Sequence, residues 1–257
     1  MALSIRDVSK MFDNSKKDTL SCINLEIQDG EFVCFVGPSG CGKSTLLNIV
    51  AGLDQPTSGE VLLDGQKVTG PGSDRVVMFQ EAALFPWLNV IDNVKFGMEI
   101  AGLSKKEQEE KAHHYLKMVQ LWDFRHYAIH EISGGMKQRT ALARSLSLDS
   151  KVLLMDEPFS ALDKQTTNTL RDELVNIWLE TKKTILFVTH SVEEAVFLAD
   201  RIVVLSDNPG EIKKIYEVNM ERPRHIEEPG FVELRKDILN QVRKEVEKIA
   251  EEEYDKK

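Results

Sequence analysis

The sequence predicts an α/β fold with a mostly parallel sheet, and three observations lead to it. Strand-like apolar runs at 151–155, 184–188 and 201–206 alternate with helical stretches. This alternation is typical of parallel strands whose connecting helices cover both faces of a sheet. An earlier strand-like run, 31–36, leads through a glycine-rich turn into a helical stretch at 43–50. The length of 257 residues suits one large α/β domain or one domain with an insertion.

Two regions of the chain are predicted to differ from this parallel core. Before and after the glycine-rich turn, short strands such as 59–63 and 75–79 are separated by turns, so we expect an N-terminal antiparallel β part. From 88 to 148 the apolar periodicity is helical, which predicts a helical subdomain inserted into the core. We therefore expect a single domain, 1–257. In chain order it consists of core 1–87, helical insertion 88–148, core 149–218 and C-terminal helical extension 219–257.

The C-terminal extension should contain a helix over 231–254. Apolar residues recur there at steps of three and four, which forms one stripe. The stripe consists of Phe231, Leu234, Ile238, Val242, Val246 and Ile249. Packing of this helix on its own domain is favoured over a helix that binds a partner.

Charge and composition exclude some classes of protein. The 33 Lys and Arg residues against 42 Asp and Glu give a net charge of −9, which argues against nucleic-acid binding. No run approaches the roughly 18–20 apolar residues that span a bilayer, so a membrane role would need a partner. The cysteines Cys22, Cys34 and Cys41 match no zinc or redox spacing, and we expect Cys22 and Cys34 to be buried.

The glycine-rich turn satisfies the phosphate-loop pattern G-x-x-x-x-G-K-[ST]. It reads Gly37-Pro38-Ser39-Gly40-Cys41-Gly42-Lys43-Ser44. Glycines let backbone N–H groups surround a phosphate, and the following helix N-terminus adds partial positive charge. Lys43 would reach the β- and γ-phosphates, and Ser44 would ligate Mg²⁺. Cys41 is expected to be a small filler, with ligand-protected thiol reactivity as the alternative.

Acidic and polar residues follow three of the predicted strands. Asp156 and Glu157 end the apolar run 152–155, so Asp156 would hold Mg²⁺ and Glu157 would polarise the attacking water. Gln80 and His190 also follow strands. Alone, each is most often a solvated or structural residue, but the carboxyl ends of parallel strands are where open α/β sheets bind ligands.

The segment Ile132-Ser133-Gly134-Gly135-Met136-Lys137-Gln138-Arg139 closely resembles the signature of the ATP-binding cassette family, usually written L-S-G-G-Q. Ile132 and Met136 depart from that pattern without removing the serine and glycines. Ser133 can cap a helix beginning near Gly134, whose N-terminus would form a second anion site.

Other family elements follow in order along nearly the whole chain. Phe12 resembles the aromatic that stacks on adenine, although an isolated aromatic could equally be a core residue at a strand end. Gln80 resembles the glutamine that links metal to partner, and His190 resembles the switch histidine. Ser160-Ala161-Leu162-Asp163 resembles the loop that crosses the dimer.

The resemblance implies a P-loop NTPase fold and an ATPase that binds ATP and Mg²⁺ as a head-to-tail homodimer. The residues it places at the nucleotide are Phe12, Gly37, Pro38, Ser39, Gly40, Cys41, Gly42, Lys43, Ser44, Thr45, Ser133, Gly134, Gly135 and Asp163. The catalytic residues are Lys43, Gln80, Glu157 and His190, and the metal ligands are Ser44, Gln80 and Asp156.

The segment after Gln80 bears on the partner. Leu84-Phe85-Pro86-Trp87 should form a loop that either packs locally or lines a groove for a membrane partner's helix. This loop, with Asn208-Pro209-Gly210 and Arg222-Pro223-Arg224, is similar to the nitrate, sulfonate and taurine importer branch. The resemblance implies a peripheral subunit at the cytoplasmic face of the membrane, beneath a permease and fed by an external solute-binding protein.

Two other classes remain as alternatives. A cassette ATPase acting on DNA, ribosomes or cofactor assembly would share the same chemistry. The single cassette and the lack of a heptad insertion or zinc spacing argue against it. An exporter-type motor is the other alternative, and the Pro86-Trp87 loop disfavours it.

Overall fold

The computed structural model describes residues 3–13, 17–160, 162–207 and 209–254. The chain divides into two compact units, one formed by Met1–Gly72 with Thr184–Lys257 and the other by Ser73–Lys183. This division separates the chain at positions other than 87/88 and 148/149. It does not test the boundaries expected there, which stay a prediction.

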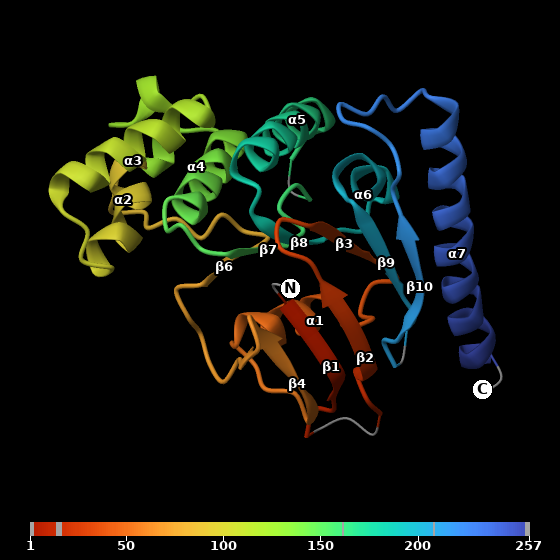
Figure 1. Cartoon of the computed structure of the whole chain (residues 1–257). Helices are drawn as coiled ribbons and strands as arrows, with labels where there is room; N and C mark the ends of the chain where they lie inside the picture. Colours follow the sequence, from red (N-terminus) through yellow and green to blue (C-terminus); the bar gives the residue numbers. More distant parts are fainter. Residues whose placement is uncertain (1–2, 14–16, 161, 208, 255–257) are drawn as a thin grey trace. The chain divides into compact units, whose positions relative to one another are not determined.

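The first unit contains eleven helices and strands within its described residues. In chain order they are β1 (Leu3–Lys10), β2 (Leu20–Ile27), β3 (Phe32–Val36), α1 (Lys43–Ala51), β4 (Ser58–Leu63), β5 (Gln66–Lys67), β8 (Thr184–Val188), α6 (Val192–Leu198), β9 (Arg201–Leu205), β10 (Ile212–Glu217) and α7 (Pro229–Tyr254) (Figure 1).

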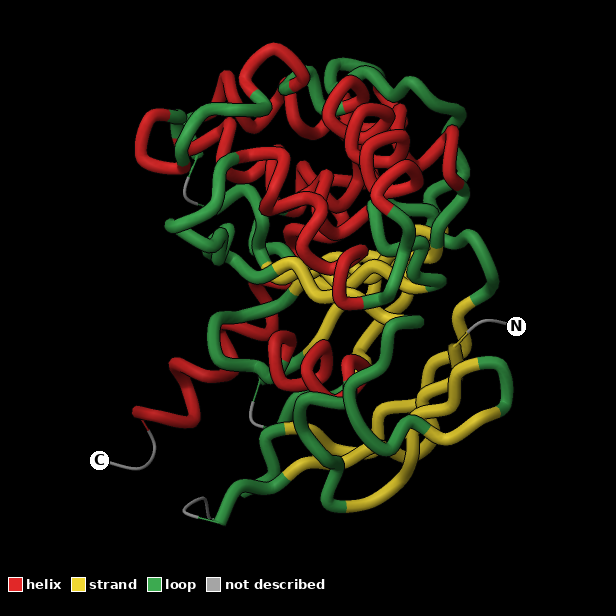
Figure 2. The backbone as a smooth tube through the Cα atoms, turned by 90° about the vertical axis from the view of Figure 1, so that its left-hand side faces the viewer, coloured by secondary structure: helices red, strands yellow, loops and turns green. Residues whose placement is uncertain are grey.

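The N-terminal strands form the antiparallel part that the sequence predicts. They pair in the order β2-β1-β4-β5, and Figure 2 shows this group beside the N-terminus. The register of β1 with β2 shifts twice, which is the mark of a β-bulge. Cys22 lies in the second shift with a φ of 49°, and its thiol is exposed. The expectation that Cys22 is buried is therefore wrong, because the extra residue turns its side chain outward.

A second group of strands positions the phosphate loop. β3 pairs in parallel with β8 on one side and with β9 on the other, and β10 adds antiparallel to β9. Every residue of β3 and β8 is buried, as expected for strands of a parallel sheet covered on both faces. The chain leaves the carboxyl end of β3 and enters α1 through the glycine-rich turn.

The second unit combines two strands with four α-helices. Its elements are β6 (Arg75–Met78), α2 (Val90–Ile100), α3 (Lys105–Met118), the 3₁₀ turns η1 (Trp122–Phe124) and η2 (Ile129–Glu131), α4 (Gly134–Leu146), β7 (Val152–Asp156) and α5 (Lys164–Thr181). β6 and β7 pair in parallel, with Met78 opposite Met155. Helices α2, α3 and α4 contact one another (Figure 1), so the region 88–148 is helical as predicted.

Helix α7 packs on its own unit, as favoured from the sequence. It contacts α6 and β9, and the side chains of Phe231 and Ile238 are fully buried. Val246 is 48% exposed, so the stripe is only partly covered, and the side chain of Ile249 lies outside the described residues. Among the residues that the structure describes, no helix has the length and apolar character needed to cross a membrane.

Candidate functional site

The phosphate loop lies in the first unit and ends at the start of α1. Gly42 precedes the helix with a φ of 93°, a left-handed conformation that glycine adopts without steric strain. As a glycine, this N-cap residue has no side chain that could cap the helix. The loop rim formed by Ser39, Gly40 and Ser44 is exposed, while Thr45 is half-buried. The first turn of α1 therefore faces outward in a form suited to an anionic ligand.

Lys43 is the strongest electrostatic feature of this loop. Its side chain is buried, and its ammonium donates hydrogen bonds to the carbonyl oxygens of Gly37 (3.0 Å) and Pro38 (2.7 Å). A buried ammonium is stabilised fully only by an opposite charge, so the site fits a phosphate. The hydrogen bonds to Gly37 and Pro38 fold the Lys43 side chain back onto the start of the loop.

Cys41 behaves as a filler. Its side chain is buried, and burial raises the pKa of its thiol against the opposing effect of Lys43. A thiol with a raised pKa is a poor nucleophile, which favours the packing role over reactivity.

Phe12 and His190, also in the first unit, are both exposed. Phe12 follows β1, is 44% exposed and has the Lys10 ammonium 4.9 Å from its ring centroid. It is not a core residue, so its ring remains accessible for stacking. His190 follows β8 directly, and the hydroxyls of Thr189 and Ser191 on either side of it are hydrogen-bonded into the start of α6.

In the second unit, the strand register brings Gln80 and the two acids to one edge. Met78 of β6 pairs with Met155 of β7, so Gln80 and Asp156 both follow the same row of the sheet. Glu157 has a φ of 44°, a left-handed conformation that costs about 1–2 kcal/mol for a residue with a side chain. Such strain is concentrated at functional positions, which supports a role for Glu157 in the reaction.

The start of α4 carries the second predicted anion site. Ser133 is the N-cap, and its hydroxyl accepts a hydrogen bond from the Met136 backbone N–H, which confirms the predicted cap. A Cβ added to Gly135 would lie 2.6 Å from Cγ2 of Thr166, so the N-terminus of α4 closely approaches α5. Asp163 caps α5 in turn, and it accepts a hydrogen bond of 2.6 Å from the Thr166 hydroxyl.

Sequence reasoning missed the residues that fix the loop around Gln80. Gln138 donates to the Gln80 carbonyl (2.9 Å), and Arg144 donates to the carbonyls of Ala82 (3.0 Å) and Ala83 (2.9 Å). Both side chains project from α4, so the signature helix holds the glutamine loop. These contacts join residues 58 to 62 positions apart, so no local pattern in the sequence signals them.

The loop after Gln80 packs locally through Phe85 and exposes Trp87. Phe85 packs locally against Phe96, with ring centroids 4.3 Å apart, and Arg144 lies over its ring. Trp87 next to it is 74% exposed. An exposed tryptophan beside a packed phenylalanine is the composition expected of a protein interface.

The predicted metal ligands have the chemistry that Mg²⁺ prefers. Ser44, Gln80 and Asp156 all offer oxygen, and Mg²⁺ is commonly held by one or two carboxylates together with waters and substrate phosphates. No group of three or more histidine, cysteine or acidic side chains suited to a metal occurs among the described residues. The donor set thus fits Mg²⁺ and not a thiolate- or imidazole-bound metal. Ala161 and Asn208 of the quoted family segments lie outside the described residues.

Comparison with curated proteins gives close relatives. The chain is 47% identical over 249 residues to the nitrate import ATP-binding protein NrtD of Synechocystis sp., covering 96% of this chain and 91% of the relative. It is 44% identical over 243 residues to the aliphatic sulfonates import ATP-binding protein SsuB of Bacillus thuringiensis, covering 94% of this chain and 96% of that relative.

A solved structure and a family model agree with these relatives. The chain resembles an ATP-binding cassette solved as a dimer in a post-hydrolysis state with ADP and Pi, with a TM-score of 0.73 and 32% identity. The match covers 85% of this chain and all of that one. The family model described as ABC transporter matches residues 20–160, which is more than half of the chain. The chain therefore belongs to the ABC transporter family and is one of its ATP-hydrolysing cassettes.

Proposed function

We propose that the chain is the motor subunit of an importer, which couples ATP binding and hydrolysis to uptake of a small solute through a membrane permease. The observation that carries the proposal is the buried Lys43 ammonium, held by loop carbonyls at the start of α1, whose N-cap is a glycine. That arrangement is suited to the β- and γ-phosphates of a nucleotide. Relatives that are named as nitrate and sulfonate import proteins support the transport assignment.

Hydrolysis would depend on Lys43, Glu157 and His190. Lys43 neutralises phosphate charge, and Glu157 orients and polarises the attacking water. His190 would contact the γ-phosphate while it is transferred to water, and Phe12 would stack on the adenine. Ser44, Gln80 and Asp156 would hold Mg²⁺, which when bound supplies positive charge to the phosphate oxygens.

The second anion site would serve another copy of the chain. Ser133, Gly134 and Gly135 lie at a helix N-terminus, and the Ser133 hydroxyl that accepts from Met136 still has its own proton to donate. In a head-to-tail homodimer, this end of α4 would grip the γ-phosphate held by the partner's phosphate loop. Hydrolysis would then remove the bridge and release the dimer. The dimeric relative bound to ADP and Pi supports this arrangement.

The membrane partner would be a permease that contacts the exposed Trp87. The subunit would lie at the cytoplasmic face of the membrane, with an external solute-binding protein delivering the solute. Nitrate and sulfonates are the first candidates. The two relatives are matched at 47% and 44% identity, a difference too small to choose between these solutes.

The proposal is tested by trapping the complex. The Glu157→Gln variant should bind ATP without hydrolysing it, which would hold the assembly together during purification from detergent-solubilised native membranes. Mass spectrometry should identify a multi-span permease among the co-purified proteins. The same purification from a Trp87→Ala, Glu157→Gln double variant is the control and should recover less permease. Recovery of only non-membrane proteins or nucleic acid would contradict the importer assignment.

A further inference from the structure

Residues on both sides of His190 are tied to the first turn of α6. The Thr189 hydroxyl donates to the Glu194 carboxylate (2.6 Å) and accepts from the backbone N–H of Ser191 (3.0 Å). Ser191 caps the helix, accepting from the Glu194 backbone N–H at 3.2 Å. The segment that carries His190 is therefore fixed to the start of α6, and the position of α6 sets the position of the histidine.

The other end of α6 is held by the C-terminal segment. Arg224 is buried, and its guanidinium donates to a ring of carbonyl oxygens around the helix end. These belong to Val196, Phe197, Ala199, Val218 and Met220, at distances of 2.7–3.3 Å. The last carbonyls of a helix lack partners within the helix, and a cation there is favourable. Burial lowers the pKa of Arg224 to about 10, so it remains charged at neutral pH.

Arg222 also binds the C-terminal end of α6. It donates to the Leu198 carbonyl (2.6 Å) and to the Asp200 carboxylate (2.7 Å). The Asp200 carboxylate also accepts from the backbone N–H of Phe32, at the start of β3. The arginines therefore connect α6 to the strand that leads into the phosphate loop.

Helix α7 contacts the opposite, N-terminal end of α6. Arg235 donates to the Glu193 carboxylate at 2.9 Å, and both side chains are about one-third exposed. Figure 1 shows α6 and α7 as neighbours, and the buried Phe231 lies one helical turn before Arg235. The C-terminal segment thus contacts both ends of a helix only seven residues long. An isolated helix of that length is not stable in water, so its placement depends on tertiary contacts, which include these and its packing on β3.

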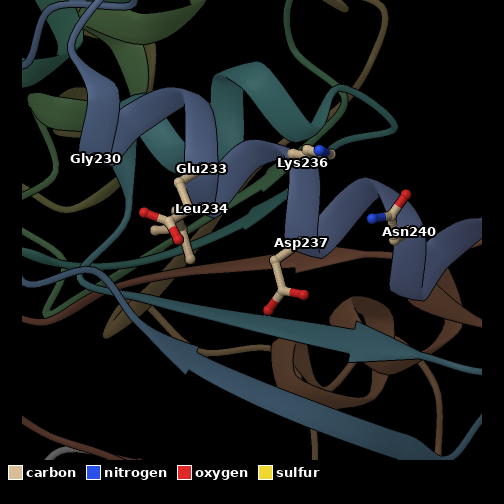
Figure 3. A pocket seen from close by; sticks show the side chains of 6 residues that line it. All are labelled: Gly230, Glu233, Leu234, Lys236, Asp237 and Asn240. Carbon is tan, nitrogen blue, oxygen red and sulfur yellow. The ribbon is translucent and has the colours of Figure 1, made fainter.

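A further contact joins α7 to strand β10. A pocket of about 490 Å³ lies along α7, lined by Gly230, Glu233, Leu234, Lys236, Asp237 and Asn240 (Figure 3). Asp237 forms an ion pair with Lys214 of β10 at 3.5 Å. The lining mixes both charges around an open surface, which gives no ligand class, but the ion pair adds a contact that holds α7 to the strands.

We propose that the segment from Arg222 through α7 positions His190 for ATP hydrolysis, with Arg224 and Arg235 as positioning residues that act through α6. The inference rests on the proposed role of His190 at the γ-phosphate. It assigns a purpose to the C-terminal extension, which lies outside residues 20–160 matched by the family model. Loosening α6 should slow the chemical step without weakening nucleotide binding, because the phosphate loop itself is unchanged.

The test is a double-mutant cycle on the Arg235–Glu193 pair, which joins α7 to the N-terminal end of α6. Arg235→Gln and Glu193→Gln should each lower kcat of the full-length chain about threefold to tenfold with an unchanged KM for ATP. The double variant should lose no more than either single variant, because both remove the same contact. Arg224→Lys should lower kcat further, since an ammonium cannot replace a planar fork of five donors. Arg243→Gln, an exposed arginine on the same helix, is the matched control and should be neutral.

Two results would overturn the proposal. One is an unchanged kcat in Arg235→Gln and in a folded Arg224→Lys, and the other is losses that multiply in the Arg235→Gln, Glu193→Gln double variant. If Arg224→Lys does not fold, the double-mutant cycle on the partly exposed Arg235–Glu193 pair tests the proposal by itself. His190→Ala separates this inference from the function it rests on. Parental hydrolysis by His190→Ala would refute the role of the histidine itself. An inactive His190→Ala beside fully active Arg235→Gln and Arg224→Lys would refute only the role of the C-terminal segment.

Discussion

The phosphate loop and the start of α4 both place glycines at a helix N-terminus, but the two regions need them for different reasons. Gly40 and Gly42 have φ values of 85° and 93°, where residues with side chains are strained. Gly135 lies within α4, and its requirement comes from space. A Cβ there would meet the Thr166 methyl at 2.6 Å. One region uses glycine for backbone conformation and the other for close packing.

The phosphate loop and the start of α4 also differ in how the helix N-terminus is capped. The N-cap of α1, Gly42, has no side chain that could cap the helix, whereas Ser133 caps α4 through the Met136 N–H. The first turn of α1 therefore suits a ligand held throughout the cycle, which a buried Lys43 also favours. The start of α4 is stable without a ligand, which suits a surface that engages a phosphate only when a second copy approaches. The predictions below test this contrast.

The largest effect is expected at the phosphate loop. Lys43→Ala removes the buried ammonium that we assign to the β- and γ-phosphates, and we expect ATP hydrolysis to fall at least about 100-fold. A steady-state phosphate-release assay measures it. A control, Lys137→Ala, removes a lysine on α4 and should keep most of the activity. Undiminished turnover in Lys43→Ala would refute the assignment of the loop.

A smaller, reversible loss is expected at the signature. Gly135→Ala should lower kcat about tenfold, because α4 must move away from Thr166 and small displacements at a reacting site are costly. Adding Thr166→Ser removes the clashing methyl but keeps the hydroxyl that donates to Asp163, so activity should return. If activity does not return, Gly135 is needed for close approach of a phosphate and not for packing on α5.

The cap on α4 should contribute to stability in a way that the phosphate loop does not. Ser133→Ala should lower the free energy of unfolding by about 1 kcal/mol, the usual contribution of an N-cap side chain. Ser133→Asn keeps a capping oxygen and should retain most of it. Ser39→Ala, at an exposed serine of the phosphate loop, should change stability by less than about 0.5 kcal/mol. Urea unfolding of the three variants measures these differences, and equal losses at Ser133 and Ser39 would remove the distinction between the two regions.

The smallest effect concerns the cap of α5 and its dependence on pH. The hydrogen bond from the Thr166 hydroxyl lowers the pKa of Asp163 below its ordinary value of 3.8, with the Thr166 and Gln165 backbone N–H groups adding to it. A lowered folded-state pKa stabilises the protein above pH 3.8, and this contribution is lost as the pH falls through the lower folded-state value. The parent should therefore unfold at a higher temperature than Asp163→Asn at pH 7, and the difference should shrink as the pH falls below 3.8. A constant difference across this range would show that the carboxylate charge is not involved.

Local features of the fold and the site could be predicted from the sequence. The strand and helix around the phosphate loop, expected at 31–36 and 43–50, are Phe32–Val36 and Lys43–Ala51. The Ser133 cap was predictable because a helix N-cap depends on residues within one turn. Features that depend on distant residues were not. The Gln138–Gln80 hydrogen bond joins residues 58 positions apart, and the bulge that exposes Cys22 depends on the pairing of β1 with β2. Neither leaves a periodic signal in the chain.

The central claim, that one copy supplies the phosphate loop and another the signature, is tested most directly by mixing two inactive variants. Lys43→Ala has an intact α4 end, and Ser133→Arg has an intact phosphate loop. Each alone should lack ATPase activity, because both sites of its homodimer are damaged. In a mixed dimer, one site combines the two intact halves, so the account predicts that mixing restores activity toward half of the parental rate per mixed dimer. If the mixture remains as inactive as its components, the site is not shared between copies and the account is contradicted.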